Sequence, residues 1–423
     1  MRKWFADYPA EQYIKRNFII NTIDGSVYAF AISFISLTTV MPLFVKKIGG
    51  NNIAVALIPV FWTMGFNFTQ IFVASYVRKK AYKKPLLLVT ALFQRLPWLL
   101  LGIFCWFFFE NISGDIQLVI FFFCFGLAAV AGGINLPGWF DLVAKLTPVR
   151  LRGRLFASRA ILGALLGIIG GWISTIILDD YMFPRSFGAL FFLAFGVIMI
   201  SYVALLYIKE LKPNPAKEEL HYKEFFKRIP SLIKHNSNYR NFLIADALLT
   251  ASLMADAFFA LNAFKKFTLG DVYAGTFTII IMSSIIIGNI LFGFIADKFG
   301  HKLNMLMAAI SVVAACLLAL ATPSVLAYYF VFIFSAFTAT LMLVSRLSII
   351  AELCEEEDRP TYIAVTNMIT APFILLGIAG GWVANMYGYN IVFILAGFFA
   401  LVSSFMFGMK VKEPRQPVLS ILS

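Results

Sequence analysis

Charged residues are scarce in this sequence. Asp, Glu, Lys and Arg make up 13% of its 423 residues, against about 25% in an ordinary soluble domain, whereas 61% of the residues are hydrophobic. This balance excludes a soluble globular protein. The apolar residues fall into about twelve stretches, each close to the roughly 20 residues that a helix needs to cross a bilayer. We therefore predict an all-α integral membrane protein with twelve transmembrane helices.

Residues that carry enzymatic or metal chemistry are also few. The three histidines, His221, His235 and His301, all lie in predicted loops, and the sequence contains no H-E-x-x-H motif. The four cysteines form no C-x-x-C pair, which leaves them as packing residues. The phosphate-binding pattern G-x-x-x-x-G-K-[ST] is absent, which excludes ATP hydrolysis by this chain as a driving force. We expect neither an enzyme nor a protein with a cofactor or a metal site.

Positive charge is in excess, with a formal net charge of +13. A nucleic-acid-binding protein would gather this charge on a folded soluble face, but here the basic residues lie in the breaks between apolar stretches. We therefore expect no nucleic-acid partner. Since Lys and Arg concentrate in the cytoplasmic loops of membrane proteins, the basic breaks at 78–84, 145–154 and 209–240 predict that both termini are cytoplasmic. The expected location is the inner (plasma) membrane of a bacterium.

The predicted spans form two groups of six. They lie near residues 18–45, 53–77, 85–109, 116–141, 155–178 and 187–208, and near 242–264, 272–296, 303–321, 326–350, 362–386 and 391–409. We predict an N-terminal six-helix bundle over 1–208, a cytoplasmic linker over 209–240, and a C-terminal six-helix bundle with a short cytoplasmic tail over 241–423. Apolar residues at helical spacing beside lysines predict an interfacial amphipathic helix in the linker. This helix either lies on the membrane surface or binds a partner.

The two halves share short sequence matches. Residues 16–20 read Arg-Asn-Phe-Ile-Ile and residues 240–244 read Arg-Asn-Phe-Leu-Ile, and Gly-Gly-Trp recurs at 170–172 and 380–382. Both pairs fall at corresponding places of the halves. Two pseudo-symmetric six-helix bundles in parallel orientation are typical of transporters that hold a site near the bilayer midplane.

The loop at 293–302, Gly-Phe-Ile-Ala-Asp-Lys-Phe-Gly-His-Lys, resembles the signature loop of the major facilitator superfamily. The family pattern E-x6-R matches Glu352 and Arg359, whereas the first half offers only Asp141 with Arg150 and Arg152. The resemblance implies the major facilitator fold and a conformational latch at the cytoplasmic edge; the other interpretation is loop charge that sets topology. The latch candidates are Gly293, Asp297, Gly300, Lys302, Asp141, Arg152, Glu352 and Arg359.

Ionisable and polar residues inside spans are candidates for the transport site, because burying them in hydrocarbon is costly. Asn21, Asp24 and Tyr28 in the first span are spaced by three and four residues, which places them on one helical face. Asp24 is either a proton carrier or a hydrogen-bonded carboxylate near the helix end. Arg159 is assigned to the cytoplasmic charge network. For Arg95 three options stay open: a partner on a neighbouring helix, a widened cavity, or a local water defect.

Further candidates come from spans 4, 7 and 10. The resemblance implies that spans 1 and 7 line a central cavity. Asn262 would bind substrate or a neighbouring helix, and Arg346 an anion, lipid headgroups or Glu352. The candidates in these spans are Asn135, Trp139, Asp246, Asp256, Asn262 and Arg346.

These features predict a secondary transporter that moves a small organic solute by alternating access, coupled to protons through Asp24 or Asp256. Its expected partners are the solute, protons and membrane lipid, and we expect a monomer. The four glycines Gly163, Gly167, Gly170 and Gly171 either serve helix packing or reflect their resemblance to the antiporter signature of family drug exporters, which favours export. The alternatives are an uptake permease for a sugar or other nutrient, and a sensor or scaffold on the same fold.

Overall fold

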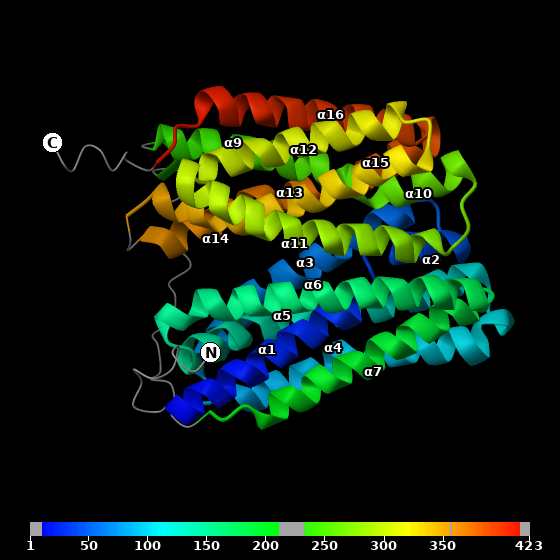
Figure 1. Ribbon diagram of the computed structural model, residues 1–423, viewed down its shortest axis with the longest axis horizontal. Helices are drawn as coiled ribbons and strands as arrows, with labels where there is room; N and C mark the ends of the chain where they lie inside the picture. The colour runs from blue at the N-terminus through cyan, green and yellow to red at the C-terminus, as the bar shows by residue number, and fades with distance from the viewer. Residues whose placement is uncertain (1–10, 211–231, 235, 356–357, 415–423) are drawn as a thin grey trace. The chain divides into compact units, whose positions relative to one another are not determined.

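The computed structural model describes residues 11–210, 232–234, 236–355 and 358–414, and within these ranges every regular element is a helix (Figure 1). Most of the linker at 209–240, where the interfacial amphipathic helix is predicted, lies outside the described residues. Long helices follow from the composition, because a helix satisfies its own backbone hydrogen bonds in a solvent that offers none.

The described part of the first 210 residues forms seven α-helices. They are α1 (Glu11–Phe34), α2 (Val40–Lys47), α3 (Asn52–Lys79), α4 (Lys84–Ile103), α5 (Gly114–Leu146), α6 (Val149–Asp180) and α7 (Arg185–Tyr207). Helix α4 runs on through a π-helical turn, η2 (Phe104–Phe108), and a 3₁₀ turn, η3 (Phe109–Asn111).

The second half follows the same plan. Its helices are α9 (Ser237–Ser252), α10 (Asp256–Phe267), α11 (Tyr273–Phe299), α12 (His301–Ala321), α13 (Val325–Glu352), α14 (Arg359–Ile374), α15 (Leu376–Tyr387) and α16 (Tyr389–Phe405). A 3₁₀ turn, η4 (Leu253–Ala255), separates α9 from α10, and a π-helical turn, η6 (Met406–Lys410), follows α16.

Three predicted spans are broken into two helices. The first is interrupted between α1 and α2, where Pro42 has no N–H to donate to the carbonyl of Thr38. The eleventh is interrupted at Leu375, three residues after Pro372. The seventh is interrupted by η4, whose residues 253–255 include no proline. Asp256, the first residue of α10, therefore lies at a helix N-terminus inside the span.

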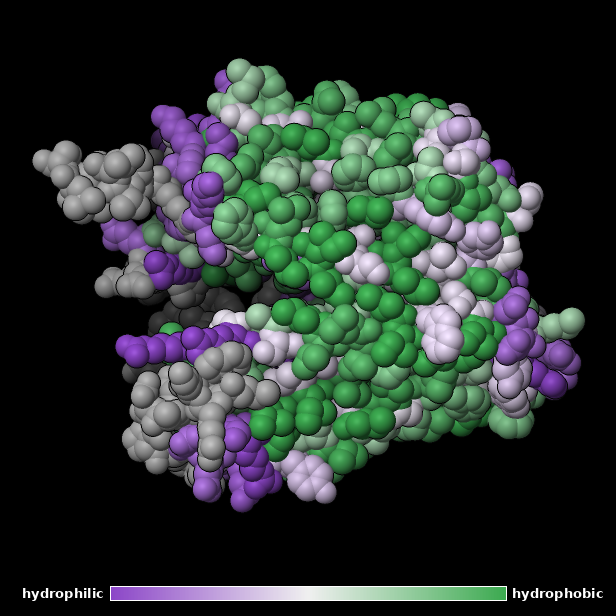
Figure 2. All heavy atoms as spheres, in the orientation of Figure 1, coloured by the Kyte–Doolittle hydropathy of each residue, from purple (hydrophilic) through white to green (hydrophobic). Residues whose placement is uncertain are grey.

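The helices match the dimensions of a bilayer. Eleven helical stretches in the described residues are long and apolar enough to cross a membrane. Helix α1 takes the place of the first predicted span, and its 24 residues include Glu11, Lys15, Arg16 and Asp24, which lower its hydropathy. In each unit taken by itself, hydrophobic side chains cover the middle of the helices and hydrophilic ones gather near their ends (Figure 2). The structure is thus an all-helical membrane protein.

The chain divides into two compact units. Unit 1 comprises Met1–Gly50, Phe61–Leu220 and Gly270–Met282, and unit 2 comprises Asn51–Val60, His221–Leu269 and Ser283–Ser423. The start of α3 therefore belongs to unit 2 and the start of α11 to unit 1. Close backbone contacts account for this: a Cβ on Gly381 would lie 2.7 Å from the carbonyl oxygen of Asn52, and one on Gly275 would lie 2.7 Å from that of Gly171.

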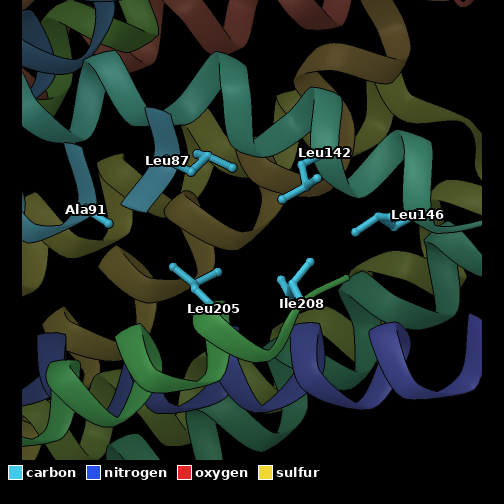
Figure 3. Packing of buried hydrophobic residues seen from close by; sticks show 6 residues of the cluster. All are labelled: Leu87, Ala91, Leu142, Leu146, Leu205 and Ile208. Atoms are coloured by element: carbon cyan, nitrogen blue, oxygen red, sulfur yellow. The ribbon is translucent and has the colours of Figure 1, made fainter. Parts of the chain in front are cut away.

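Unit 1 is built around α1, which runs beside α6 and α7 (Figure 1). Its hydrophobic core includes a cluster of apolar side chains from α4, α5 and the end of α7 (Figure 3). The cluster consists of Leu87, Ala91, Leu142, Leu146, Leu205 and Ile208. Apolar contacts of this kind hold α4, α5 and α7 around the polar residues described below.

The four glycines of α6 are packing positions. A Cβ on Gly163 would lie 2.8 Å from Cβ of Ala29, and one on Gly170 would overlap Ser33, so both admit α1. A Cβ on Gly167 would lie 2.8 Å from Sδ of Met282, and one on Gly171 would lie 3.0 Å from N of Ile279, so these two admit α11. Close helix approach accounts for all four glycines without an antiporter signature.

Gly133 gives a test of this packing. A Cβ there would lie 2.6 Å from the carbonyl oxygen of Gly65 and 2.7 Å from that of Phe66, whereas one on Gly153 of α6 would meet nothing within 4 Å. We expect Gly133→Ala to destabilise the protein by about 1–3 kcal/mol through overpacking. Gly153→Ala, the control, gains up to about 1 kcal/mol of helix propensity. Thermal unfolding in detergent should separate the two variants, and equal unfolding temperatures would contradict the close approach of α3 and α5.

Candidate functional site

A cavity of about 160 Å³ lies among the helices of unit 1. It is lined by Asp24, Tyr28, Phe66, Gln94, Arg95, Gly132, Asn135, Leu136, Trp139, Arg159 and Leu205. Six helices contribute to the lining: α1, α3, α4, α5, α6 and, through Leu205, α7. Two positively charged side chains, Arg95 and Arg159, and one negatively charged side chain, Asp24, meet here within membrane-spanning helices.

Asp24 is the centre of the polar contacts in this cavity. The carboxylate is 4% exposed, and each of its oxygens accepts a hydrogen bond. Ser201 Oγ on α7 donates to Oδ1 at 2.7 Å, and Arg159 Nη1 on α6 donates to Oδ2 at 3.3 Å. Asp24 is therefore a paired carboxylate that ties α1 to α6 and α7.

Arg159 lies in this site. The sequence instead predicted that it belongs to a charge network at the cytoplasmic end of the helices. It is ten residues from the start of α6, about 15 Å along the helix. Its Nη1 also donates to the carbonyl oxygen of Asn21 at 2.7 Å, and its guanidinium lies 4.5 Å from the centre of the Trp139 ring. A Cβ on Gly25 would overlap the guanidinium, so this glycine leaves the space that Arg159 occupies.

Arg95 has its partner on a neighbouring helix, the first of the three options. It is 2% exposed, and each of its three side-chain nitrogens donates a hydrogen bond. The acceptors are the carbonyl oxygen of Ile198 at 3.1 Å, Ser201 Oγ at 3.0 Å and the carbonyl oxygen of Ala91 at 2.8 Å. Ser201 thereby links the second guanidinium to Asp24.

The structure brings most of the predicted first-half site residues together. Tyr28 accepts a hydrogen bond from Gln94 Nε2 at 2.9 Å, and Asn135 Nδ2 contacts the carbonyl oxygen of Leu87 at 3.5 Å. Asn21 is buried behind the cavity, and its Oδ1 accepts no hydrogen bond within the described residues. Ser201 was missed because a small hydroxyl in an apolar span carries no sequence signal.

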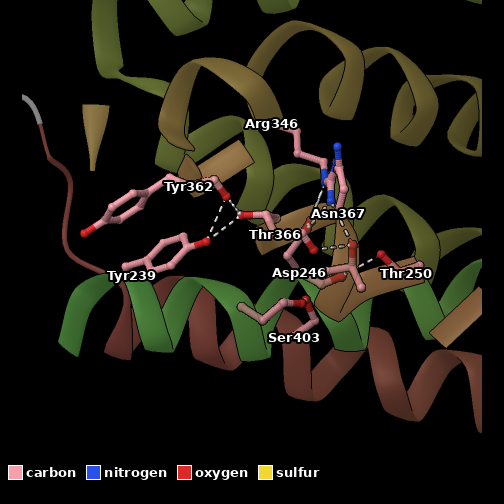
Figure 4. Close-up of polar contacts among 10 residues, drawn as sticks. Tyr239, Asp246, Thr250, Arg346, Tyr362, Thr366, Asn367 and Ser403 are labelled. Carbon is pink, nitrogen blue, oxygen red and sulfur yellow. Dashed lines mark hydrogen bonds and ion pairs between the residues drawn. The ribbon is translucent and has the colours of Figure 1, made fainter. Parts of the chain in front are cut away.

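Unit 2 contains a second buried ion pair, between Asp246 on α9 and Arg346 on α13 (Figure 4). Asp246 is fully buried, and Arg346 Nε donates to its two oxygens at 3.1 and 2.9 Å. Arg346 also donates to Asn367 at 3.0 Å and to Thr370 at 3.0 Å, both on α14. Its partner is thus Asp246, and not Glu352 or a lipid headgroup.

This pair belongs to a polar seam that joins α9, α14 and α16. Tyr239 OH donates to the carbonyl oxygen of Tyr362 at 2.9 Å and lies 3.0 Å from Thr366 Oγ1, and Ser403 Oγ donates to the carbonyl oxygen of Ala245 at 2.8 Å (Figure 4). The satisfied seam fits a structural role for Asp246 and Arg346.

The two other candidates of the seventh span differ. Asn262 is buried, and its Nδ2 lies 3.0 Å from Tyr328 OH and 3.4 Å from the carbonyl oxygen of Ala319, which makes it an interhelical contact. Asp256 accepts one hydrogen bond, from Ser335 Oγ at 3.1 Å, and within the described residues it forms no ion pair. Within the described residues, the carboxylate of Asp256 thus has no cationic partner.

At the signature loop, Glu413 is an acidic partner that the sequence interpretation missed. Gly300 has a positive φ of 91°, and a Cβ on it would overlap the Glu413 carboxylate. Lys302 N donates to Glu413 Oε2 at 3.2 Å, and Lys302 Nζ donates to the carbonyl oxygen of Gly408 at 3.2 Å. Gly293 faces open space, because a Cβ there would meet nothing within 4 Å.

The remaining latch candidates have several different contacts. Glu352 Oε1 lies 3.8 Å from His301 Nε2, and this histidine begins α12 rather than lying in a loop. Arg359 donates to the carbonyl oxygen of Ala351 at 3.3 Å. In the first half, Asp141 lies 3.9 Å from Lys83 Nζ, and Arg152 donates to the backbone of Ala144 and Thr147. Asp297 is exposed at the end of α11. The latch stays a prediction.

Comparison with solved structures identifies the fold. The nucleoside transporter NupG superposes with a TM-score of 0.70 at 13% identity over 95% of this chain and 99% of that one. A D-xylose-proton symporter gives 0.68 at 14% identity, over 95% and 99%. A bacterial homologue of the human lysosomal transporter Spinster gives 0.69 at 11% identity, over 96% and 99%. These likenesses show a shared fold.

The sequence adds a family match. The family model described as Major Facilitator Superfamily matches residues 263–421. This match lies in the second half of the chain and includes the 293–302 loop. The resemblance of the 293–302 loop is thereby confirmed, and this family consists of secondary transporters and not typically of enzymes. A search of curated protein sequences finds no match.

The Asp246–Arg346 pair gives a stability test. We expect Asp246→Asn to cost about 3–5 kcal/mol, because it leaves the buried Arg346 charge uncompensated. Asp271→Asn is the control: its partner is Lys47 at 2.6 Å, the two side chains are 22% and 31% exposed, and such pairs contribute about 0–1 kcal/mol. Thermal unfolding measures both, and the double variant Asp246→Asn, Arg346→Gln should recover part of the loss. Equal losses in the two single variants would contradict the structural role.

Proposed function

We propose that this major facilitator transporter moves a small organic solute through alternating access, with proton coupling at Asp256. The observation that carries the proposal is the cavity in unit 1, where Asp24, Arg95 and Arg159 meet inside membrane-spanning helices. Ionisable residues at membrane depth are costly and mark substrate and ion pathways. A sensor or scaffold would not need a polar cavity among its spans.

The coupling role goes to Asp256 because of its contacts. A carboxylate that binds and releases a proton cannot be held permanently ionised by a strong cationic partner. Asp24 is paired with Arg159 and Asp246 with Arg346, so each of these carboxylates already has a cationic partner. Asp256 accepts a hydrogen bond from the neutral hydroxyl of Ser335, and the thiol of Cys316 on α12 lies near it. A proton on Asp256 removes a partly buried charge that no described cation compensates.

Location and direction complete the proposal. Basic side chains of 83–84 and 145–154 lie near the N-terminal end of α1 and the residues that follow α7. For example, Lys145 contacts Glu210 at 2.7 Å, and Tyr13 contacts the carbonyl oxygen of Lys209. By the positive-inside rule this supports cytoplasmic termini in a bacterial inner membrane. The likeness to a proton symporter supports proton coupling at the level of the fold. Helix packing accounts for the glycines of α6, so these residues do not favour export over uptake. The direction of transport is decided by measuring solute flux.

Proteoliposomes with a trapped pH dye test the coupling. Wild type, exposed to a panel of glucose, uridine, a dipeptide and benzoate, should show a pH change with the solute it transports. In Asp256→Asn we expect solute exchange to continue and the solute-dependent pH change to be lost, because the amide binds no proton.

Asp271→Asn is the matched control, since it removes a carboxylate whose partner is the exposed Lys47 and should keep both signals. A pH change of wild-type size in Asp256→Asn would refute the coupling role. Solute flux in wild type without any pH change would point to another ion or to facilitated diffusion.

A further inference from the structure

The cavity of unit 1 carries more positive than negative charge. Its lining includes the guanidinium groups of Arg95 and Arg159 and one carboxylate, that of Asp24, so its formal charge is +1. The other polar lining residues are neutral: Tyr28, Gln94, Asn135 and Trp139. An uncompensated charge at membrane depth is costly, and a bound ligand of opposite sign would remove the cost.

Both oxygens of Asp24 already accept a hydrogen bond. Its Oδ1 accepts from Ser201 and its Oδ2 from Arg159. Ser201 in turn accepts from Arg95, so Arg159 contacts this carboxylate directly and Arg95 contacts it through Ser201. A cation entering the cavity would compete with these donors for one carboxylate and would be repelled by two guanidinium groups.

Arg159, by contrast, keeps donors for an anion. Its hydrogen bonds to Asn21 and Asp24 both come from Nη1, and within the described residues its Nε and Nη2 donate none. The Nε–Nη2 edge of a guanidinium is a fork that matches a carboxylate. The Arg159 side chain is 16% exposed, whereas Arg95 is 2% exposed with all three nitrogens engaged. Arg159 is suited to touch the ligand, and Arg95 supplies a fixed charge behind it.

The rest of the lining limits the size and polarity of the ligand. Phe66, Leu136, Trp139 and Leu205 provide apolar wall. The volume of about 160 Å³ suits a small organic molecule. A single negative charge would bring the formal charge to zero.

We propose that this cavity binds a small organic monocarboxylate, with its carboxylate on Arg159 and its apolar part against Trp139 and Phe66. This names the substrate class of the proposed transport function and rests on it. A monoanion is favoured over a dianion because the cavity offers one positive charge in excess.

Matched ligand pairs test the charge preference. The full-length protein in detergent is titrated calorimetrically with benzoate and benzamide, phenylacetate and phenylacetamide, and hexanoate and hexanamide, and with phenyl phosphate as a dianion. We expect at least one carboxylate to bind about tenfold or more tightly than its amide. Equal affinities within every pair, no binding by any carboxylate, or tightest binding of phenyl phosphate would each overturn the proposal.

Variants then assign the preference to Arg159. Arg159→Gln should abolish it, and Arg159→Lys, which keeps the charge but loses the fork, should reduce it. Arg185→Gln removes an exposed arginine at the start of α7, outside the cavity lining, and should keep it. If Arg159→Gln does not fold, Arg159→Lys and Gly25→Ala, which displaces the guanidinium, carry the test. A preference that survives these changes would overturn the role of Arg159.

Binding and flux separate this inference from the proposed function. A protein that binds benzoate more tightly than benzamide but moves no solute in liposomes would support the inference and reject the transport function. A protein that moves only neutral solutes would support the function and overturn the inference.

Discussion

The high cost of an ionised group in hydrocarbon governs this structure. In a medium without water, each charged side chain within the spans needs a partner, and the partner has to come from another helix. Asp24 binds Arg159 and Ser201, and Asp246 binds Arg346. These contacts join α1 to α6 and α7, and α9 to α13. The few charges that the composition allows therefore fix which helices are neighbours, in addition to marking the site.

The close approach of helices makes these contacts possible. A carboxylate and a guanidinium on two helices meet only if the backbones come near enough, and in α1 the space is provided by Gly25, over which Arg159 lies. Gly163 and Gly170 of α6 face the same helix. Small residues and charged residues thus act together: the glycines bring α6 against α1, and the ion pair fixes the rotation of one helix against the other.

The spans, and the face of α1 with Asn21, Asp24 and Tyr28, could be predicted because both depend on local spacing. Arg159 was misplaced because its own position in the sequence does not indicate that Gly25, on another helix, makes room for it. The break before Asp256 contains no proline and gave no signal. Glu413 follows the last span and is 111 residues from Lys302, so their contact forms only when the chain folds. What escaped prediction is in each case a contact between segments distant in sequence.

The charges of the two units together bear on the mode of coupling. On the proposed assignments, the unit 1 cavity has an excess of one positive charge and unit 2 has one carboxylate, Asp256, without a described cation. With both a monoanion and a proton bound, each unit is neutral; with neither bound, the two charges are opposite and sum to zero. If only one ligand is bound, a net charge remains within the membrane. Exchange of anion for proton would pass through such states in both directions, whereas joint transport avoids them. On these proposed assignments, the states in which anion and proton are both bound or both absent are the ones that leave no net charge on the two sites.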